Sequence, residues 1–259
     1  MSSLARLALP GLVAMWSTLA HGDDITYQLE TSVASSYVAR GIVQYASRDV
    51  ASSQNAAALR VDHVADGALL VSAWNAIALS GYDAQPGTAL ELDLSVGYER
   101  HVGQLAVSTG YAGYLFPKHL DGTPFDGGHE LWAAVSYDNP YLVPSAAAYV
   151  EVVRQQGLYL MVGTTRDLHH QAWTFSPAIS VGGAGYRRYL GGDQAAGPHV
   201  NDVTAAFAAR RDLDRGVYAA VKLYYAFRAT PSELMDGDDS WGFSGRSAWF
   251  GLLAVGFAR

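Results

Sequence analysis

The residues of this sequence that could do chemistry are charged side chains placed at alternate positions within apolar segments. Glu91 and Asp93, for example, alternate with Leu90, Leu92 and Leu94. A period of two puts the carboxylates and the leucines on opposite faces of an extended strand. The same alternation along the chain assigns the following charged residues to one polar face: Glu30, Arg40, Arg60, Glu91, Asp93, Glu130, Glu151, Asp202, Arg210, Lys222 and Arg228.

Charges of both signs on the wall of a narrow space could filter dissolved solutes. The same charges could instead pair with one another and fill that space, because buried charges usually have partners. For Arg40 we expect a salt bridge with Glu30 or Glu91. The sequence does not distinguish between a charged filter and a space closed by paired charges.

Two other groups of residues could carry chemistry. His169-His170 and His199-Val200-Asn201 could serve an enzyme that cuts lipids, but neither has a serine at a recognisable spacing. We therefore predict no catalytic residue. The segment from Glu233 to Asp239 could hold a divalent cation through its carboxylates, although its spacing matches no calcium loop. A solvated acidic loop is the simpler interpretation, so we predict neither a metal site nor a cofactor.

The elements that must position the charged residues are β-strands, typified by the hairpin from Leu90 to Tyr111 with its turn near residues 101–103. Segments with the same period of two recur along the chain, separated by turn residues such as Gly, Pro, Asn and Asp. Twelve strands are predicted in all, the hairpin supplying two and the others lying near residues 25–41, 57–64, 68–79, 130–137, 141–153, 158–166, 173–181, 203–209, 217–228 and 249–257.

The predicted connections alternate between long and short, with one exception, the short link at residues 155–157. An even strand number, strands of about ten residues and alternating loop lengths are typical of an outer-membrane barrel. In such a barrel the apolar face contacts lipid and the polar face lines the lumen. A soluble secreted β protein shares the alternation but has no reason to place its long loops at one end.

Composition excludes several other classes of protein. The chain has 259 residues, of which 50% are hydrophobic and 16% charged, and it has no cysteine. Beyond the N-terminus no stretch approaches the ~20 apolar residues that a membrane helix needs. The net charge of −7 argues against nucleic acid as a partner, because no basic stripe is present to neutralise phosphates.

The N-terminus has the pattern of an export signal. Arg6 precedes an apolar run from Leu7 to Leu19, and Ala20-His21-Gly22 forms a cleavage site of small residues. We predict a secretory signal peptide at residues 1–22 and a barrel domain at residues 23–259. The alternative is a buried N-terminal helix.

One segment carries a family resemblance. The residues from Ser35 to Gln44, SSYVARGIVQ, fall at the end of the first predicted strand. They are similar to the S-x-Y-x-x-R-G-x-x-Q signature of the TorF-type porin family of proteobacteria. The similarity continues loosely through Asp66-Gly67, Trp74-Asn75, Glu91 to Asp93 and Gly128 to Tyr137. The resemblance implies an outer-membrane barrel that passes small solutes, with no settled substrate.

We therefore predict one all-β domain, a twelve-stranded antiparallel transmembrane β-barrel in the outer membrane of a Gram-negative bacterium, with periplasmic termini. Its expected function is that of a porin-like channel for passive diffusion of small hydrophilic solutes. Its expected partners are outer-membrane lipid, those solutes and the outer-membrane assembly machinery. The alternatives are a closed structural or surface-interaction barrel and a lipid-modifying barrel enzyme.

Overall fold

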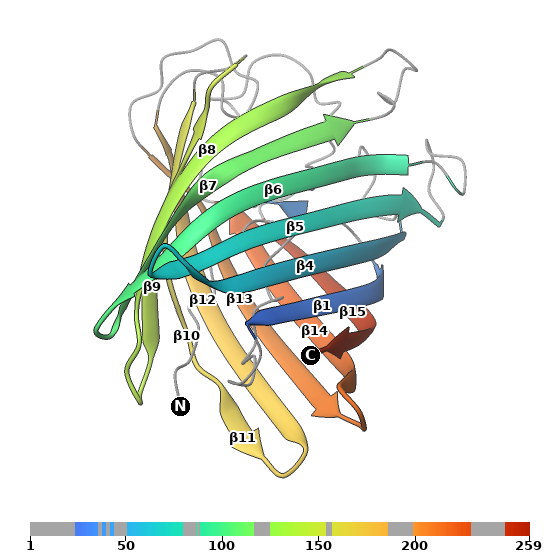
Figure 1. The fold of residues 1–259 in the computed structure, drawn as a ribbon. Helices are drawn as coiled ribbons and strands as arrows, with labels where there is room; N and C mark the ends of the chain where they lie inside the picture. Colours follow the sequence, from blue (N-terminus) through green and yellow to red (C-terminus); the bar gives the residue numbers. More distant parts are fainter. Residues whose placement is uncertain are drawn as a thin grey trace.

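The strands of this chain close into a single antiparallel barrel (Figure 1). The computed structural model describes residues 24–35, 38–39, 42–43, 51–79, 87, 89–116, 125–153, 157–185, 199–228 and 247–259. The barrel strands are β1 (Ile25–Ala34), β4 (Ser52–Val64), β5 (Gly67–Ala78), β6 (Ala89–Val102), β7 (Leu105–Phe116), β8 (Phe125–Tyr137), β9 (Val143–Glu151), β10 (Leu158–Thr165), β12 (Trp173–Gly185), β13 (His199–Asp212), β14 (Val217–Arg228) and β15 (Ser247–Ala258).

Each barrel strand pairs with its neighbours in sequence, and β1 pairs with β15 to close the ring. Closure leaves no unpaired edge, which a sheet in hydrocarbon could not tolerate. The predicted fold class and strand number are confirmed. Among the described residues no helix has the length and apolarity to cross a bilayer.

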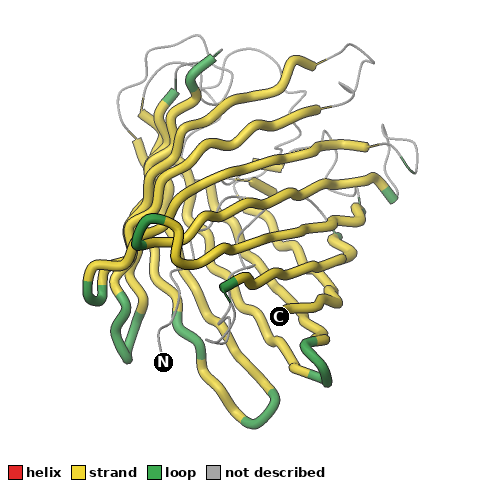
Figure 2. The backbone as a smooth tube through the Cα atoms, in the orientation of Figure 1, coloured by secondary structure: helices red, strands yellow, loops and turns green. Residues whose placement is uncertain are grey.

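The connections separate by length between the two ends of the barrel. At one end, the short-turn end, two-residue turns join β4 to β5 and β6 to β7, and Arg259 pairs with Tyr27. Gly103 has a φ of 62°, which suits the first position of such a tight turn. The other ends of the strands, among them the end of β9 and the start of β10, form what is here named the long-loop end (Figure 2).

Two short elements depart from the regular order. β11 (Leu168–His170) follows β10 after a two-residue break and pairs only with β12, so the β11–β12 hairpin lengthens the wall at the short-turn end. β2 (Val38–Ala39) and β3 (Ile42–Val43) pair with each other in a separate sheet.

The prediction that the first strand runs to Gly41 is therefore wrong. β1 ends at Ala34 because its partner β4 begins opposite it, at Ser52. The signature segment from Ser35 to Gln44 lies beyond the barrel strand, and parts of it, Arg40 included, are outside the described residues.

Burial separates the two faces of the barrel wall. In β6, Glu91 is 4% exposed and Leu94 is 50% exposed. The same inversion, with polar residues buried and large apolar residues exposed, holds around the ring. A soluble protein has the opposite arrangement, whereas a barrel with lipid outside has this one.

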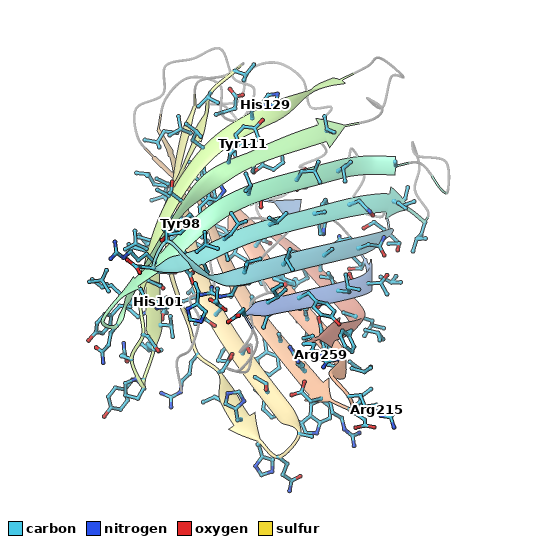
Figure 3. All side chains as sticks on the ribbon, viewed as in Figure 1. Tyr98, His101, Tyr111, His129, Arg215 and Arg259 are labelled. Carbon is cyan, nitrogen blue, oxygen red and sulfur yellow. The ribbon has the colours of Figure 1, made fainter. Side chains whose placement is uncertain are left out.

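Aromatic side chains on the outer face gather towards both ends of the wall. Near the short-turn end Tyr27 stacks on Phe257, and towards the long-loop end Tyr225 packs against Trp249. Figure 3 shows Tyr98 near the short-turn end of β6 and Tyr111 beside His129 farther along β7 and β8. Two such girdles are typical of the interfacial regions of a bilayer.

Candidate functional site

The charged residues that the alternating pattern places on the polar face of the strands lie in the lumen, wherever their side chains are described. Nine charged residues with described side chains face inward, and most of them are buried. Eight are predicted pore-lining residues, and the ninth is Asp202. The eight are Glu30, Arg60, Glu91, Asp93, Glu130, Glu151, Arg210 and Lys222. Arg40 lies outside the described residues. Arg228 is the last residue of β14 and lies opposite Asp202 of β13, although its side chain is not described.

An ion pair crosses the strand that closes the barrel. Lys222 Nζ on β14 lies 2.5 Å from Glu30 Oε1 on β1. The two strands flank β15, where Gly256 lies opposite Glu30 and Leu252 lies opposite Lys222, with the small Ala254 between them. Glu30 also accepts a 2.9 Å hydrogen bond from the Tyr218 hydroxyl. Lys222 and Tyr218 thus contact Glu30, which is one of the two partners, with Glu91, expected for Arg40; Arg40 itself lies outside the described residues.

Tyr218 holds this central network against the wall. Its hydroxyl accepts a 2.6 Å hydrogen bond from Gln28 Nε2. Its ring lies where a Cβ at Gly256 would stand, 2.3 Å from the ring carbon Cζ. Glycine at this position is therefore what allows the ring to lie flat over β15. The guanidinium of Arg210 stacks on the same ring, 3.9 Å from its centroid.

The cations near the short-turn end are paired with neighbouring acids. Arg60 on β4 contacts Glu99 on β6 at 2.6 Å and Asp62 on its own strand at 2.8 Å. Arg210 on β13 contacts Asp212 at 2.7 Å. Such bidentate or shared contacts satisfy the guanidinium groups, so this end of the lumen presents paired charges.

The long-loop half of the lumen carries a concentration of acids, here named the carboxylate band: Glu91, Asp93, Glu130, Glu151 and Asp202. Tyrosine hydroxyls hold two of them. Tyr114 donates to Glu130 at 2.5 Å, and Tyr159 donates to Asp202 at 2.8 Å. Neutral hydroxyl donors thus hold these two carboxylates in place without adding a positive charge to the lumen.

Large aromatic side chains cover the inner surface of β7 to β10, here named the aromatic wall: Tyr114, Trp132, Tyr149 and Tyr159. The ring of Trp132 packs over glycines on the two preceding strands, Gly110 on β7 and Gly97 on β6. A Cβ at Gly110 would stand 2.5 Å from the Trp132 ring, and one at Gly97 would stand 2.6 Å from it. The indole therefore lies along β6 and β7 instead of crossing the lumen.

The inner surface of β12 and β13 is different. Its central residues are small and partly exposed, and together they are named the small-residue wall: Ala178, Ser180, Thr204, Ala206 and Ala208. Tyr159 marks the boundary between the two walls, because its hydroxyl reaches Asp202 and its ring lies over Gly182. The inward side chains of β12 and β13 are therefore smaller than those of the aromatic wall, although Tyr224 of β14 lies opposite Ala206 and stacks on Phe250.

Sequence reasoning missed several residues of this site. Glu99 lies on the same alternation as Glu91 and Asp93, so its inward position could have been inferred, but not its partner Arg60, which is 39 residues away. The lumen aromatics Trp132 and Tyr218 also follow the alternation. The packing of their rings over glycines on neighbouring strands depends on the register between strands, which a local sequence pattern does not determine.

The outer wall and the ends offer little catalytic material in the described residues. His129 faces outward and its Nδ1 is hydrogen-bonded to the Tyr111 hydroxyl. His169 contacts Thr174 at 3.1 Å, and the side chain of His199 is not described. No group of three or more His, Asp or Glu side chains in the described ranges is placed to hold a metal ion. The acidic segment 233–239 lies outside them.

Comparison with known proteins gives similarity at the level of fold. No family model and no curated protein matches the chain by sequence. Among solved structures, the KdgM porin has a TM-score of 0.51 at 8% identity, covering 89% of this chain and 98% of its own. The NanC porin has a TM-score of 0.51 at 10% identity, with the same coverage of 89% and 98%.

A further solved structure, LpxR, has a TM-score close to those of the two porins. LpxR from Salmonella typhimurium has a TM-score of 0.50 at 11% identity, covering 89% of this chain and 99% of its own. This chain therefore has the fold of outer-membrane barrels that include both porins and LpxR.

Proposed function

We propose that the protein is an outer-membrane porin-like channel for passive diffusion of small hydrophilic solutes. The observation that carries the proposal is the closed twelve-stranded barrel with a charged inner face and an apolar outer face. The small side chains of β12 and β13 support a path for solutes along this wall. The long-loop end would face outward and the short-turn end the periplasm.

Paired charges support a filter of modest width. The Glu30–Lys222 pair spans β14 to β1, and the Arg60–Glu99 pair spans the adjacent stretch of wall from β4 to β6, so charges of both signs lie along this side of the lumen. Such a path favours polar solutes over apolar ones, because only the former interact with the wall without losing their hydration. Twelve strands give a narrow bore, so the route would admit small solutes only.

A closed structural barrel is the second candidate, and one observation favours it. Most inward carboxylates are almost fully buried, Asp93 at 3% and Glu130 at 3% exposure among them, which indicates close packing of the lumen around the carboxylate band. A lipid-modifying enzyme has less support, because His129 on the outer wall is bonded to a tyrosine and not to a serine.

Family, export and assembly remain parts of the same proposal. The signature at Ser35 to Gln44 supports membership of the TorF-type porin family. The pattern of residues 1–22 supports export by a cleaved signal peptide, which N-terminal sequencing of protein purified from outer membranes would test. The proposed partners are outer-membrane lipid, small hydrophilic solutes and the assembly machinery that inserts barrels; no enzymatic activity is proposed.

The test of the channel is the conductance of refolded residues 23–259 in a planar bilayer across a salt gradient. Discrete current steps with a defined reversal potential are expected. A protein that is shown to be folded by its heat-dependent gel migration, yet gives no current, would refute the channel and support the closed barrel.

A further inference from the structure

Three polar side chains form a hydrogen-bonded row on the outer face of the barrel, here named the amide ladder: Thr31, Asn55 and Asn75. Thr31 Oγ1 donates to Asn55 Oδ1 at 2.6 Å, and Asn55 Nδ2 donates to Asn75 Oδ1 at 3.0 Å. The three residues lie directly opposite one another on β1, β4 and β5. These strands are adjacent in the wall (Figure 1).

The amide ladder lies within the apolar outer surface and not at its margin. On β1 the neighbouring outward residues are Leu29 and Val33, which are 51% and 52% exposed. On β5 the outward position after Asn75 is Ile77, and Leu79, just past the end of the strand, is 43% exposed. The ladder is therefore at the depth of hydrocarbon, between the aromatic girdles.

Hydrocarbon cannot complete the hydrogen bonds of this ladder. The Asn75 amide accepts one bond from Asn55, and in the part of the chain that the structure describes its Nδ2 has no acceptor. Polar groups left without partners in lipid are costly, and those that persist there usually face protein. The exposed end of the ladder therefore calls for a hydrogen-bonding partner at the same depth.

We propose that this face is the interface of a two-fold symmetric dimer, in which the amide ladder of one copy meets that of the other. Two copies inserted in the same orientation are related by an axis along the membrane normal, so each residue meets residues at its own depth. A carboxamide has both donors and an acceptor, which makes a pair of Asn75 side chains self-complementary.

The residues around the ladder fit a close contact between two barrels. Ser53 and Ala57 are the outward residues next to Asn55 on β4, and Ala73 is next to Asn75 on β5. Small side chains allow two backbones to approach, which strengthens packing and hydrogen bonds in lipid. The inference rests on the outer face lying in lipid and not on the lumen being open.

The absence of cysteine from the natural sequence allows a direct test by cross-linking. Ala73→Cys places a reporter beside the intact ladder, and Ile179→Cys places the control on β12, on the opposite side of the barrel. In outer membranes treated with a mild oxidant, Ala73→Cys is expected to give disulfide-linked dimers several-fold above the control. Equal cross-linking of the two variants would overturn the proposal.

A second experiment asks whether the amides themselves hold the dimer. Sedimentation velocity in detergent is expected to show a dimer for the natural protein and a monomer for Asn55→Leu/Asn75→Leu. Thr109→Val is the matched control, because Thr109 is an outward polar residue on β7 whose hydroxyl is bonded to the Trp132 carbonyl. This variant is expected to remain a dimer.

Other outcomes of the sedimentation experiment count against the proposal. A natural protein that is monomeric and retains a lipid which the double leucine variant loses would assign the ladder to lipid. A double variant that folds, as judged by gel migration, and stays dimeric would show that the interface lies elsewhere. Neither result depends on whether the protein conducts ions.

Discussion

The aromatic wall and the small-residue wall are both built from antiparallel strands, but their inward side chains differ in volume. The aromatic wall on β7 to β10 carries four large rings, whereas the small-residue wall on β12 and β13 carries alanine, serine and threonine. A fixed strand number sets the circumference of a barrel, so the volume of the inward side chains determines the remaining bore. The difference teaches that inward side-chain volume is distributed unevenly around the ring, with large rings on β7 to β10 and small side chains on β12 and β13.

Adding a methyl group to the aromatic wall is expected to have the largest effect. In Gly110→Ala the new Cβ would stand 2.4 Å from the Val96 carbonyl oxygen and 2.5 Å from the Trp132 ring. We expect a loss of about 3 kcal/mol in the free energy of unfolding, since backbone as well as side chain must shift. Urea unfolding in lipid vesicles, followed by tryptophan fluorescence, measures it.

The matched change on the small-residue wall is Ala206→Val, which adds two methyl groups where space is available. It is expected to change the free energy of unfolding by less than about 1 kcal/mol. Equal losses in the two variants would contradict the claimed difference between the walls.

Filling the small-residue wall should reduce conductance several-fold. Ala206→Trp places an indole among the small inward side chains of β12 and β13, beside Tyr224, where it would narrow the proposed path. Ala205→Trp makes the same substitution one residue earlier, on the lipid face, and is expected to conduct like the natural protein. Similar currents from both variants would show that solutes take another route. Single-channel recording in planar bilayers makes the comparison.

Emptying the aromatic wall should have a smaller effect on conductance. Trp132→Ala removes a ring that already lies along Gly97 and Gly110, so little of the bore is gained. We expect an increase of less than about twofold. The control is Trp249→Ala, since Trp249 is 75% exposed on the outer face. A large rise in Trp132→Ala alone would mean that the indole is the main constriction.

The smallest expected effect belongs to the contact that joins the two walls. Tyr159→Phe removes the 2.8 Å hydrogen bond to Asp202 and leaves the ring over Gly182 in place. A loss of about 1 kcal/mol in the free energy of unfolding is expected, typical of one buried hydrogen bond. Tyr225→Phe on the outer face serves as the control. If both variants unfold alike, Tyr159 has no special role at the boundary.

Much of this arrangement could be predicted because alternation is a local property. Glu91 and Asp93 alternate with leucines, and that alone places them on the polar face of β6. The boundaries were less predictable. The end of β1 at Ala34 depends on where β4 begins, and the separate β2–β3 hairpin replaces the expected continuation of the first strand.

Partners within the lumen could not be predicted from the sequence, for a different reason. We expected Arg40, which lies outside the described residues, to pair with Glu30 or Glu91, whereas the partner that the structure shows for Glu30 is Lys222, 192 residues away. Closure between β1 and β15 brings β14 within reach of β1 across Gly256 and Ala254, two small inward residues of β15. A local sequence pattern cannot predict this contact between Glu30 and Lys222.

By itself, the sequence determined the strands, their number and the polar and apolar sides of each, because side chains in an extended chain alternate with a period of two. Only the tertiary structure decided which polar residues meet, which rings rest on Gly97, Gly110 and Gly256, and which wall keeps space. Those outcomes depend on closure and on the register between strands, and both are set by contacts between residues far apart in the chain.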